Sequence, residues 1–188
     1  SICPGIFRGA KPSCNPEGYP NLINAFASLA KLMPDLRLML IGEGGKRDIF
    51  KSQAEELGAK EKVYFMGFVP HEELPNYLGM ADVFIRPRIA EGQGISYIEA
   101  MACGVPVIGA NVGGTLDVIE HGKNGLLVSP YSTEEIAAAL RTILENDAIR
   151  NKYITEGFKT VEQKFRWEAI FEKLNGIYME LSDRNGQG

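Results

Sequence analysis

The sequence lacks the features of a membrane, secreted or disulfide-bonded protein. No apolar run approaches the roughly 20 residues that cross a bilayer, and Ser1 to Gly9 has neither the basic start nor the long apolar stretch of a signal peptide. The only cysteines are Cys3, Cys14 and Cys103, and none has Cys-x-x-Cys or Cys/His spacing. Neither a disulfide framework nor a zinc site is indicated, and a reducing, cytoplasmic setting is expected.

Positive charge is also scarce. The chain has 20 Lys and Arg against 24 Asp and Glu, a net charge of -4, and no basic cluster is interleaved with aromatic residues. We therefore expect no nucleic-acid partner. The 45% hydrophobic content and 21 glycines are typical of a globular protein rich in turns, and 188 residues suffice for one domain. We expect a single domain over residues 1-188.

Strand and helix patterns alternate along residues 21-130. Leu22 to Met33 has apolar residues at helical spacing and ends at Pro34, whereas Leu36 to Ile41 is a continuous apolar run that closes at Gly42. Further strands are expected at 63–65, 83–86, 105–108 and 126–128, and further helices at 48–57, 71–78, 95–103 and 115–120. This alternation predicts an α/β fold with a parallel sheet covered by helices on both faces.

The two ends of the chain differ from this core. Residues 1-20 are a lead rich in proline and glycine, and whether residues 2–15 contain a strand is open. Only helices are expected over residues 131-181, at 133–145, 147–164 and 167–181, with Ser132 or Thr133 as the N-cap of the first. The polar tail 182-188 is expected to fray.

A pair of carboxylates, Glu91 and Glu99, is the most informative motif. Seven residues separate them, beginning with Gly92-Gln93-Gly94, and the motif falls between a strand and a helix. The unpaired backbone N–H groups and the dipole of a helix N-terminus favour an anion such as pyrophosphate. Because a phosphate repels a carboxylate, the two Glu residues are better explained as acceptors for hydroxyl groups, such as those of sugars.

Other segments accompany this pair in order. They are Gly42-Glu43-Gly44, the run from Val63 to Val69, Ala81 to Phe84, Glu99 to Ile108, Val112-Gly113-Gly114 and Asn124 to Val128. Together these motifs resemble the C-terminal, nucleotide-sugar-binding half of GT-B glycosyltransferases, specifically family 4, over roughly residues 22–178. The resemblance implies a Rossmann-like sheet with a helical C-terminal tail.

The resemblance also implies a function. It is that of a retaining glycosyltransferase, which moves a hexose from a nucleoside diphosphate sugar to a hydroxyl of a glycan, lipid or small acceptor. Glu91 would contact the donor sugar as the catalytic residue, and Glu99 would accept from the ribose hydroxyls. The backbone of Gly92, Gln93, Gly94 and Ile95 would hold the diphosphate. Val69 would lie near the nucleobase, and the loops at Gly44 and Gly113-Gly114, at the ends of strands, would line neighbouring parts of the donor site.

The sequence departs from the family where a diphosphate needs positive charge. Members usually have Lys-Gly before the first helix, whereas this chain has Glu17-Gly18. Arg8 and Lys11 are candidates for the missing clamp, although two exposed basic residues in a polar lead need no function. Arg88 could supply the missing charge or could equally be a solvated loop residue. Because no Asp-x-Asp occurs, the resemblance implies no divalent metal and no cofactor, with helix N-termini and basic side chains stabilising the leaving diphosphate.

A second domain is implied as the partner of this one. The start at Ser1 favours an excised fragment, and in the family an N-terminal domain supplies the acceptor site. We therefore expect the isolated chain to bind nucleotide weakly and to turn over its substrate poorly. Peripheral attachment of a longer protein to the membrane is left open. The apolar stripe of the last helix, which includes Trp167, Phe171, Leu174 and Tyr178, is either a packing stripe or an interface with that domain.

Two other functions stay open. A sugar-nucleotide epimerase shares the GT-B architecture, although the family-4 motifs argue against it. A non-catalytic binding or assembly module draws support from Glu17. His71 and His121 lie in turn sequences and are expected at the surface rather than in catalysis.

Overall fold

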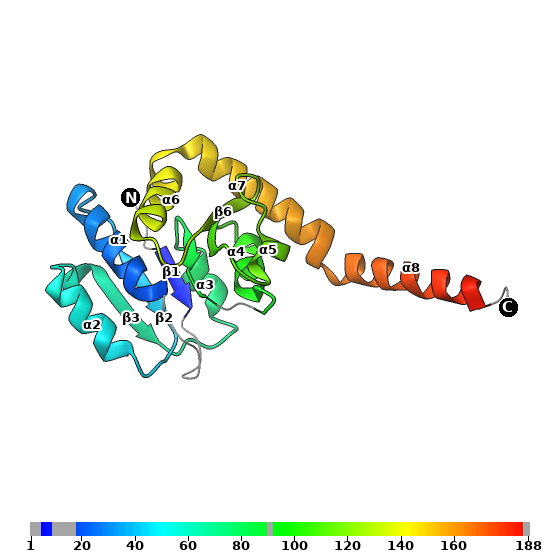
Figure 1. Cartoon of the computed structure of the whole chain (residues 1–188), viewed down its shortest axis with the longest axis horizontal. Helices are drawn as coiled ribbons and strands as arrows, with labels where there is room; N and C mark the ends of the chain where they lie inside the picture. Colours follow the sequence, from blue (N-terminus) through cyan, green and yellow to red (C-terminus); the bar gives the residue numbers. More distant parts are fainter. Residues whose placement is uncertain (1–4, 9–17, 90–91, 186–188) are drawn as a thin grey trace.

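The computed structural model describes residues 5–8, 18–89 and 92–185 (Figure 1). Helices and strands alternate up to β6, after which the chain is helical, as the sequence predicted. The elements are β1 (Gly5–Arg8), α1 (Gly18–Leu32), β2 (Leu38–Ile41), α2 (Arg47–Glu56), the 3-10 turn η1 (Lys60–Lys62), β3 (Val63–Gly67), α3 (Leu74–Leu78), β4 (Phe84–Arg86), α4 (Ile95–Ala102), β5 (Val107–Ala110), α5 (Thr115–Val118), β6 (Gly125–Val128), α6 (Thr133–Glu145), α7 (Asp147–Thr160), the π-helical turn η2 (Val161–Phe165) and α8 (Trp167–Asn185).

The six strands form one parallel sheet in the order β3-β2-β1-β4-β5-β6. The question left open for residues 2–15 is thereby answered, because Gly5–Arg8 is a strand at the centre of the sheet. Its residues pair with β2 from Gly5 opposite Leu38 to Arg8 opposite Ile41. The strand itself contains no proline, so it keeps the backbone N–H groups that a central strand needs.

Two cores lie on opposite faces of this sheet. Successive strand residues point to opposite faces, so Leu38 and Leu40 join one core and Met39 and Ile41 join the other. Helices α1 and α6 cover the first face, and α3, α4 and α5 cover the second (Figure 1). The continuous apolar strand runs in the sequence reflect burial on both faces.

Several boundaries differ from the sequence predictions. The strand predicted from Leu36 starts at Leu38, because the Leu36 N–H closes a turn onto the Met33 carbonyl at 3.0 Å. The helix expected at 71–78 begins at Leu74 after a turn. The helix expected at 147–164 ends at Thr160 and continues as η2, where the Arg166 N–H bonds the Val161 carbonyl at 3.1 Å.

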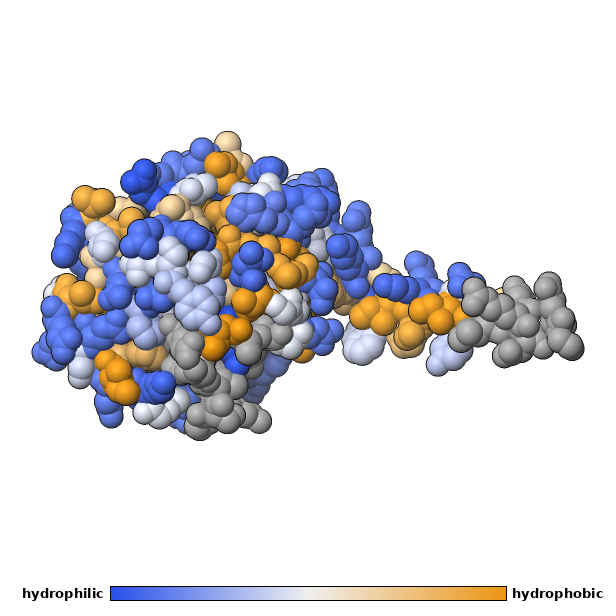
Figure 2. Space-filling view, viewed as in Figure 1, coloured by the Kyte–Doolittle hydropathy of each residue, from blue (hydrophilic) through white to orange (hydrophobic). Residues whose placement is uncertain are grey.

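Helix α8 projects away from the rest of the molecule (Figure 1) and extends to Asn185, beyond the predicted end at Leu181. Apolar side chains gather along it (Figure 2). Trp167 is 71% exposed and Tyr178 is 69% exposed, so within the described residues the stripe is not a packing surface. Neither α8 nor any other helix of the described residues combines the length and apolar character that a bilayer crossing requires.

Candidate functional site

The carboxyl ends of the parallel strands meet at one edge of the sheet. Four of the predicted site residues lie there: Arg8 ends β1, while Gly44, Val69 and Arg88 follow β2, β3 and β4. The strand order reverses between β1 and β4, and open α/β sheets bind ligands at such a switch point. Tertiary structure therefore brings together residues that are far apart in the sequence.

The N-terminus of α4 lies at this edge. Gly94 is its N-cap and adopts a left-handed conformation with φ 70°, which glycine tolerates without a steric cost. The Gly94 carbonyl accepts the Tyr97 N–H at 2.9 Å, which closes the first turn, while Gly92, Gln93 and Ile95 are exposed. Apart from the Tyr97 N–H, the N–H groups of a first helical turn have no i→i−4 partner and can receive an anion, and the anion-binding role of this turn stays a prediction.

A second glycine segment packs against this turn. A Cβ atom added to Gly114, between β5 and α5, would lie 1.8 Å from the Gly92 carbonyl oxygen. Only glycine permits such a close backbone approach. The loop at Gly113-Gly114, predicted to line a neighbouring part of the site, is thus in direct contact with the α4 turn.

Glu99 lies one turn into α4, with its side chain 18% exposed. Its Oε1 is 3.2 Å from Nε2 of His71, which precedes α3 and is 69% exposed. His71 was expected at the surface, which is confirmed, but its contact with Glu99 was not foreseen. At the C-cap of the same helix, burial and the negative charge of Glu99 raise the pKa of the Cys103 thiol, so Cys103 is not set up as a nucleophile.

Two arginines lie at the end of β4. The Arg86 guanidinium Nη1 donates to Ser96 Oγ at 2.6 Å, and the Tyr97 hydroxyl donates to the Arg86 carbonyl at 2.6 Å. Burial raises the pKa of the Tyr19 hydroxyl, and the nearby charges of Arg86 and Arg88 oppose that rise. The sequence analysis named Arg88 as a candidate for the site but not Arg86. A charged residue at the end of the apolar strand 83–86 could have pointed to Arg86 as well.

The structure says less about the remaining predicted site residues. Glu91 and Lys11 lie outside the described residues, and for Arg8 the structure describes the strand alone. Gly44 is exposed, and its carbonyl accepts the Arg47 N–H at 3.2 Å. Val69 is half-buried against the core on the α4 face of the sheet. Their roles toward a ligand stay predictions.

The described residues contain no cluster of three or more His, Cys, Asp or Glu side chains suited to a metal ion. His121, the other histidine, has a structural contact, because its Nδ1 accepts the Leu127 N–H at 3.0 Å. At the candidate site, His71 contacts a carboxylate, that of Glu99.

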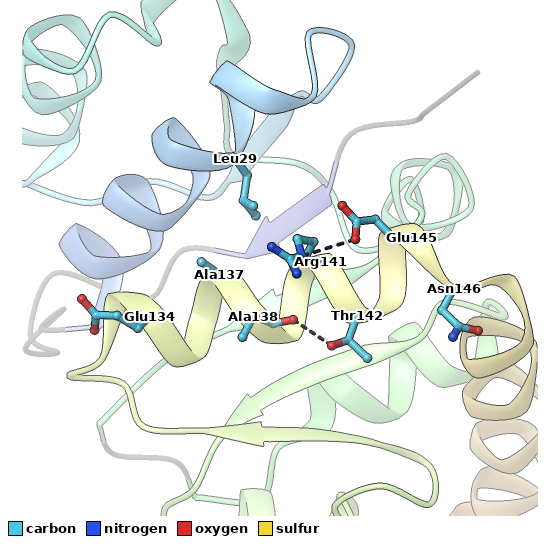
Figure 3. Close-up of a pocket in the computed structure, with 8 residues that line it drawn as sticks. All are labelled: Leu29, Glu134, Ala137, Ala138, Arg141, Thr142, Glu145 and Asn146. Atoms are coloured by element: carbon cyan, nitrogen blue, oxygen red, sulfur yellow. Dashed lines mark hydrogen bonds and ion pairs between the residues drawn. The ribbon is translucent and has the colours of Figure 1, made fainter.

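A hollow of about 580 Å³ lies elsewhere, along α6 beside Leu29 of α1 (Figure 3). Arg141 and Glu145 form an ion pair there, with 3.3 Å between Nε and Oε2, and the Thr142 hydroxyl donates to the Ala138 carbonyl at 2.8 Å. Both polar contacts are made within α6 itself. The hollow is separate from the α4 turn and contains none of the predicted site residues.

Comparisons with known proteins agree with this geometry. The family described as Glycosyl transferases group 1 matches residues 15–160. The D-inositol 3-phosphate glycosyltransferase of Corynebacterium glutamicum is 35% identical over 181 residues, which are 92% of this chain and 43% of that protein.

Two solved structures share the fold. The C-terminal domain of a glycosyl transferase group 1 family protein from Francisella tularensis superposes with a TM-score of 0.78 at 26% identity, covering 88% of this chain and 87% of that one. An Anabaena protein solved in complex with UDP and glucose superposes with a TM-score of 0.79 at 27% identity. The match covers 94% of this chain and 48% of the Anabaena chain.

The chain spans less than half the length of the curated relatives it matches. The strand order, the glycine-rich turn before α4 and the family match over residues 15–160 lead to the same conclusion. This chain belongs to the glycosyl transferases group 1 family and has the fold of the C-terminal domain of a GT-B glycosyltransferase.

Proposed function

We propose that this chain is the donor-binding domain of a retaining glycosyltransferase that moves a hexose from a nucleoside diphosphate sugar to a hydroxyl of a glycan, lipid or small molecule. One observation carries the proposal: the N-terminus of α4 opens at the switch point of the sheet, with Gly114 packed against Gly92 and two arginines beside it. Helix N-termini and arginines both favour phosphate groups. The Anabaena structure, which holds UDP and glucose, supports a ligand of this class.

In the proposed site, the backbone of residues 92–95 receives the diphosphate. Glu99, held by His71 through Oε1, accepts from the ribose hydroxyls, and Glu91 is assigned to the hydroxyls of the sugar. Val69 and Gly44 line the nucleobase side, and Arg8, Lys11 and Arg88 are the candidate cations. The positive end of α4 then stabilises the charge that develops on the departing diphosphate, without a divalent metal ion.

A separate N-terminal domain completes the proposed enzyme. The chain spans 43% of the Corynebacterium relative, a D-inositol 3-phosphate glycosyltransferase. The exposed apolar stripe of α8, from Trp167 to Tyr178, supports a partner surface outside this domain. The acceptor would bind between the two domains, so the isolated chain should bind nucleotide but turn over poorly.

Titration calorimetry of this chain with UDP, GDP and ADP, first without metal and then with magnesium, tests the proposal. We expect one nucleotide to bind without metal, and we expect Glu99→Ala to weaken that binding by about 1.5 to 3 kcal/mol, because it removes a charged hydrogen-bond acceptor. Glu134→Ala, which removes a carboxylate from the hollow along α6 rather than from the α4 turn, is the matched control.

Two outcomes would count against parts of this proposal. No binding of any of the three nucleotides would overturn the donor site in this chain. Binding that requires magnesium would overturn the metal-independent mechanism while leaving the donor site in place.

A further inference from the structure

Arg86 occupies a position that an apolar residue could fill. It is the last residue of β4, after the buried pair Phe84 and Ile85, and its own side chain is half-buried. Placing a guanidinium there removes it partly from water, which costs free energy unless it is compensated. Packing alone therefore does not explain an arginine at this position.

The contacts of Arg86 fix the first turn of α4 from two directions. Its side chain donates to Ser96 Oγ, and its carbonyl accepts the Tyr97 hydroxyl, both at 2.6 Å. Ser96 is 4% exposed and Tyr97 is fully buried. The bond from the Arg86 guanidinium is charge-assisted and therefore stronger than a neutral one, and together the two bonds hold the end of β4 and the start of α4 in one geometry.

The N-terminus of α1 lies against the same place. A Cβ atom on Gly18 would lie 1.6 Å from the Pro87 carbonyl oxygen, so α1 begins in direct contact with the residue between the two arginines. The next residue, Tyr19, is close enough to Arg86 and Arg88 for both charges to favour its ionised form. Two cations thus lie beside the N-termini of two helices, α1 and α4.

This arrangement concentrates positive charge. The N-terminal end of each helix carries a partial positive charge, so the two helix ends and the two guanidinium groups all attract an anion. An anion with several negative charges gains more from this attraction than a singly charged or neutral ligand does. The arrangement therefore fits a diphosphate better than a monophosphate or a sugar alone.

Given the donor site proposed above, we infer that Arg86 is a positioning residue for the diphosphate, which fixes the α4 turn through Ser96 and adds positive charge beneath the bound anion. Ser96 and Tyr97 transmit this effect to the backbone N–H groups of the turn. Arg88 provides the neighbouring charge.

Calorimetry with nucleoside diphosphates and monophosphates tests this inference, using UDP and UMP, GDP and GMP, and ADP and AMP on the whole chain. We expect Arg86→Met to weaken the binding of the preferred diphosphate by about ten- to a hundredfold and that of its monophosphate by much less. Arg86→Lys, which keeps the charge, should retain most of the diphosphate preference. Ser96→Ala should lower diphosphate affinity about threefold or more, because it frees the turn.

Thermal unfolding of each variant shows whether a loss of affinity comes from a loss of stability or from a changed binding site. Arg141→Met in the hollow along α6 (Figure 3) removes a charge from an exposed ion pair and should leave both affinities unchanged. If Arg86→Met leaves the ratio of diphosphate to monophosphate affinity unchanged while the unaltered chain binds, the inference is wrong and the donor site stands. If the unaltered chain binds none of the six nucleotides, the donor site and this inference fall together.

Discussion

Gly92 and Gly114 lie in contact at the candidate site, yet they are constrained in different ways. The Cα of Gly114 faces the Gly92 carbonyl, so any side chain at 114 must push the two loops apart. At Gly92, no atom of the described residues outside its chain neighbours lies within 4 Å of an added Cβ. Glycine at 114 is thus needed by the fold, whereas glycine at 92 leaves space beside the α4 turn.

Alanine substitutions should separate these two roles. We expect Gly114→Ala to lower the free energy of unfolding by about 1 to 3 kcal/mol through overpacking. Gly92→Ala should leave stability nearly unchanged but weaken diphosphate binding, because the new methyl group occupies space that the proposed ligand needs. Urea unfolding and calorimetry measure the two effects.

Gly45 is the matched control for both changes, because a Cβ there meets no described atom within 4 Å and the residue lies between β2 and α2. A Gly114→Ala variant as stable as Gly45→Ala would contradict the close contact. Unchanged nucleotide affinity in Gly92→Ala would argue against a diphosphate at this turn.

At the scale of the element, α6 depends on its N-cap. Ser132 Oγ accepts the Glu135 N–H at 3.1 Å, and the Glu135 carboxylate accepts the Ser129 N–H at 2.7 Å. The sequence left Ser132 and Thr133 as alternative caps, and the structure selects Ser132. Because Ile136 and Ile143 of α6 are fully buried in the core shared with α1, the start of this helix matters for the whole face of the sheet.

Removal of that cap should be measurable. We expect Ser132→Ala to cost about 1 kcal/mol of stability, because the Glu135 N–H loses its partner. Chemical unfolding monitored by circular dichroism gives the value. Ser28→Ala is the control: its hydroxyl donates to the Asn24 carbonyl on an exposed helix face, and its loss should stay within about 0.5 kcal/mol.

Equal effects of the two serine substitutions would show that the cap contributes nothing beyond an ordinary surface hydroxyl. A larger effect of Ser132→Ala that disappears in a Glu135→Ala background would instead indicate that the cap and the Glu135 contact act together.

At the scale of the whole molecule, α8 and α7 contribute differently to the fold. Residues of α7 reach the cores: Tyr153 is 5% exposed, and Gly157 packs against Met101 of α4. The large apolar residues of α8 from Phe171 to Met179 are exposed, and its main described contacts are with the η2 turn. An exposed apolar stripe on a projecting helix favours association with another surface.

Truncation should reveal this difference. A chain that ends at Arg166 should melt within about 3 °C of the unaltered chain, a shift equivalent to roughly 1 kcal/mol in a domain of this size. It should also self-associate less in sedimentation experiments, because the stripe from Trp167 to Tyr178 is gone. A chain that ends at Asn146 is the control and should be strongly destabilised. A large loss of stability from removing α8 alone would contradict its independence.

Local patterns in the sequence predicted much of this protein. Apolar runs that end in glycine predicted β2 and β3, helical spacing that ends at Pro34 predicted α1, and the segment Gly92-Gln93-Gly94 marked the turn before α4. These features depend on neighbours in the chain, so residue type and spacing determine them. The charge balance, the order of elements and the family motifs likewise needed no three-dimensional information.

Only the tertiary structure decided the contacts that make the site. The sequence could not place β1 at the centre of the sheet, pair His71 with Glu99, bring Gly114 onto Gly92, or direct Arg86 to Ser96. Each of these depends on how separate elements pack, and local spacing carries no information about the distance between atoms on different elements. The same reasoning applies to α8. The spacing of its residues predicts an apolar stripe, but only the packing of the chain decides that this stripe is exposed.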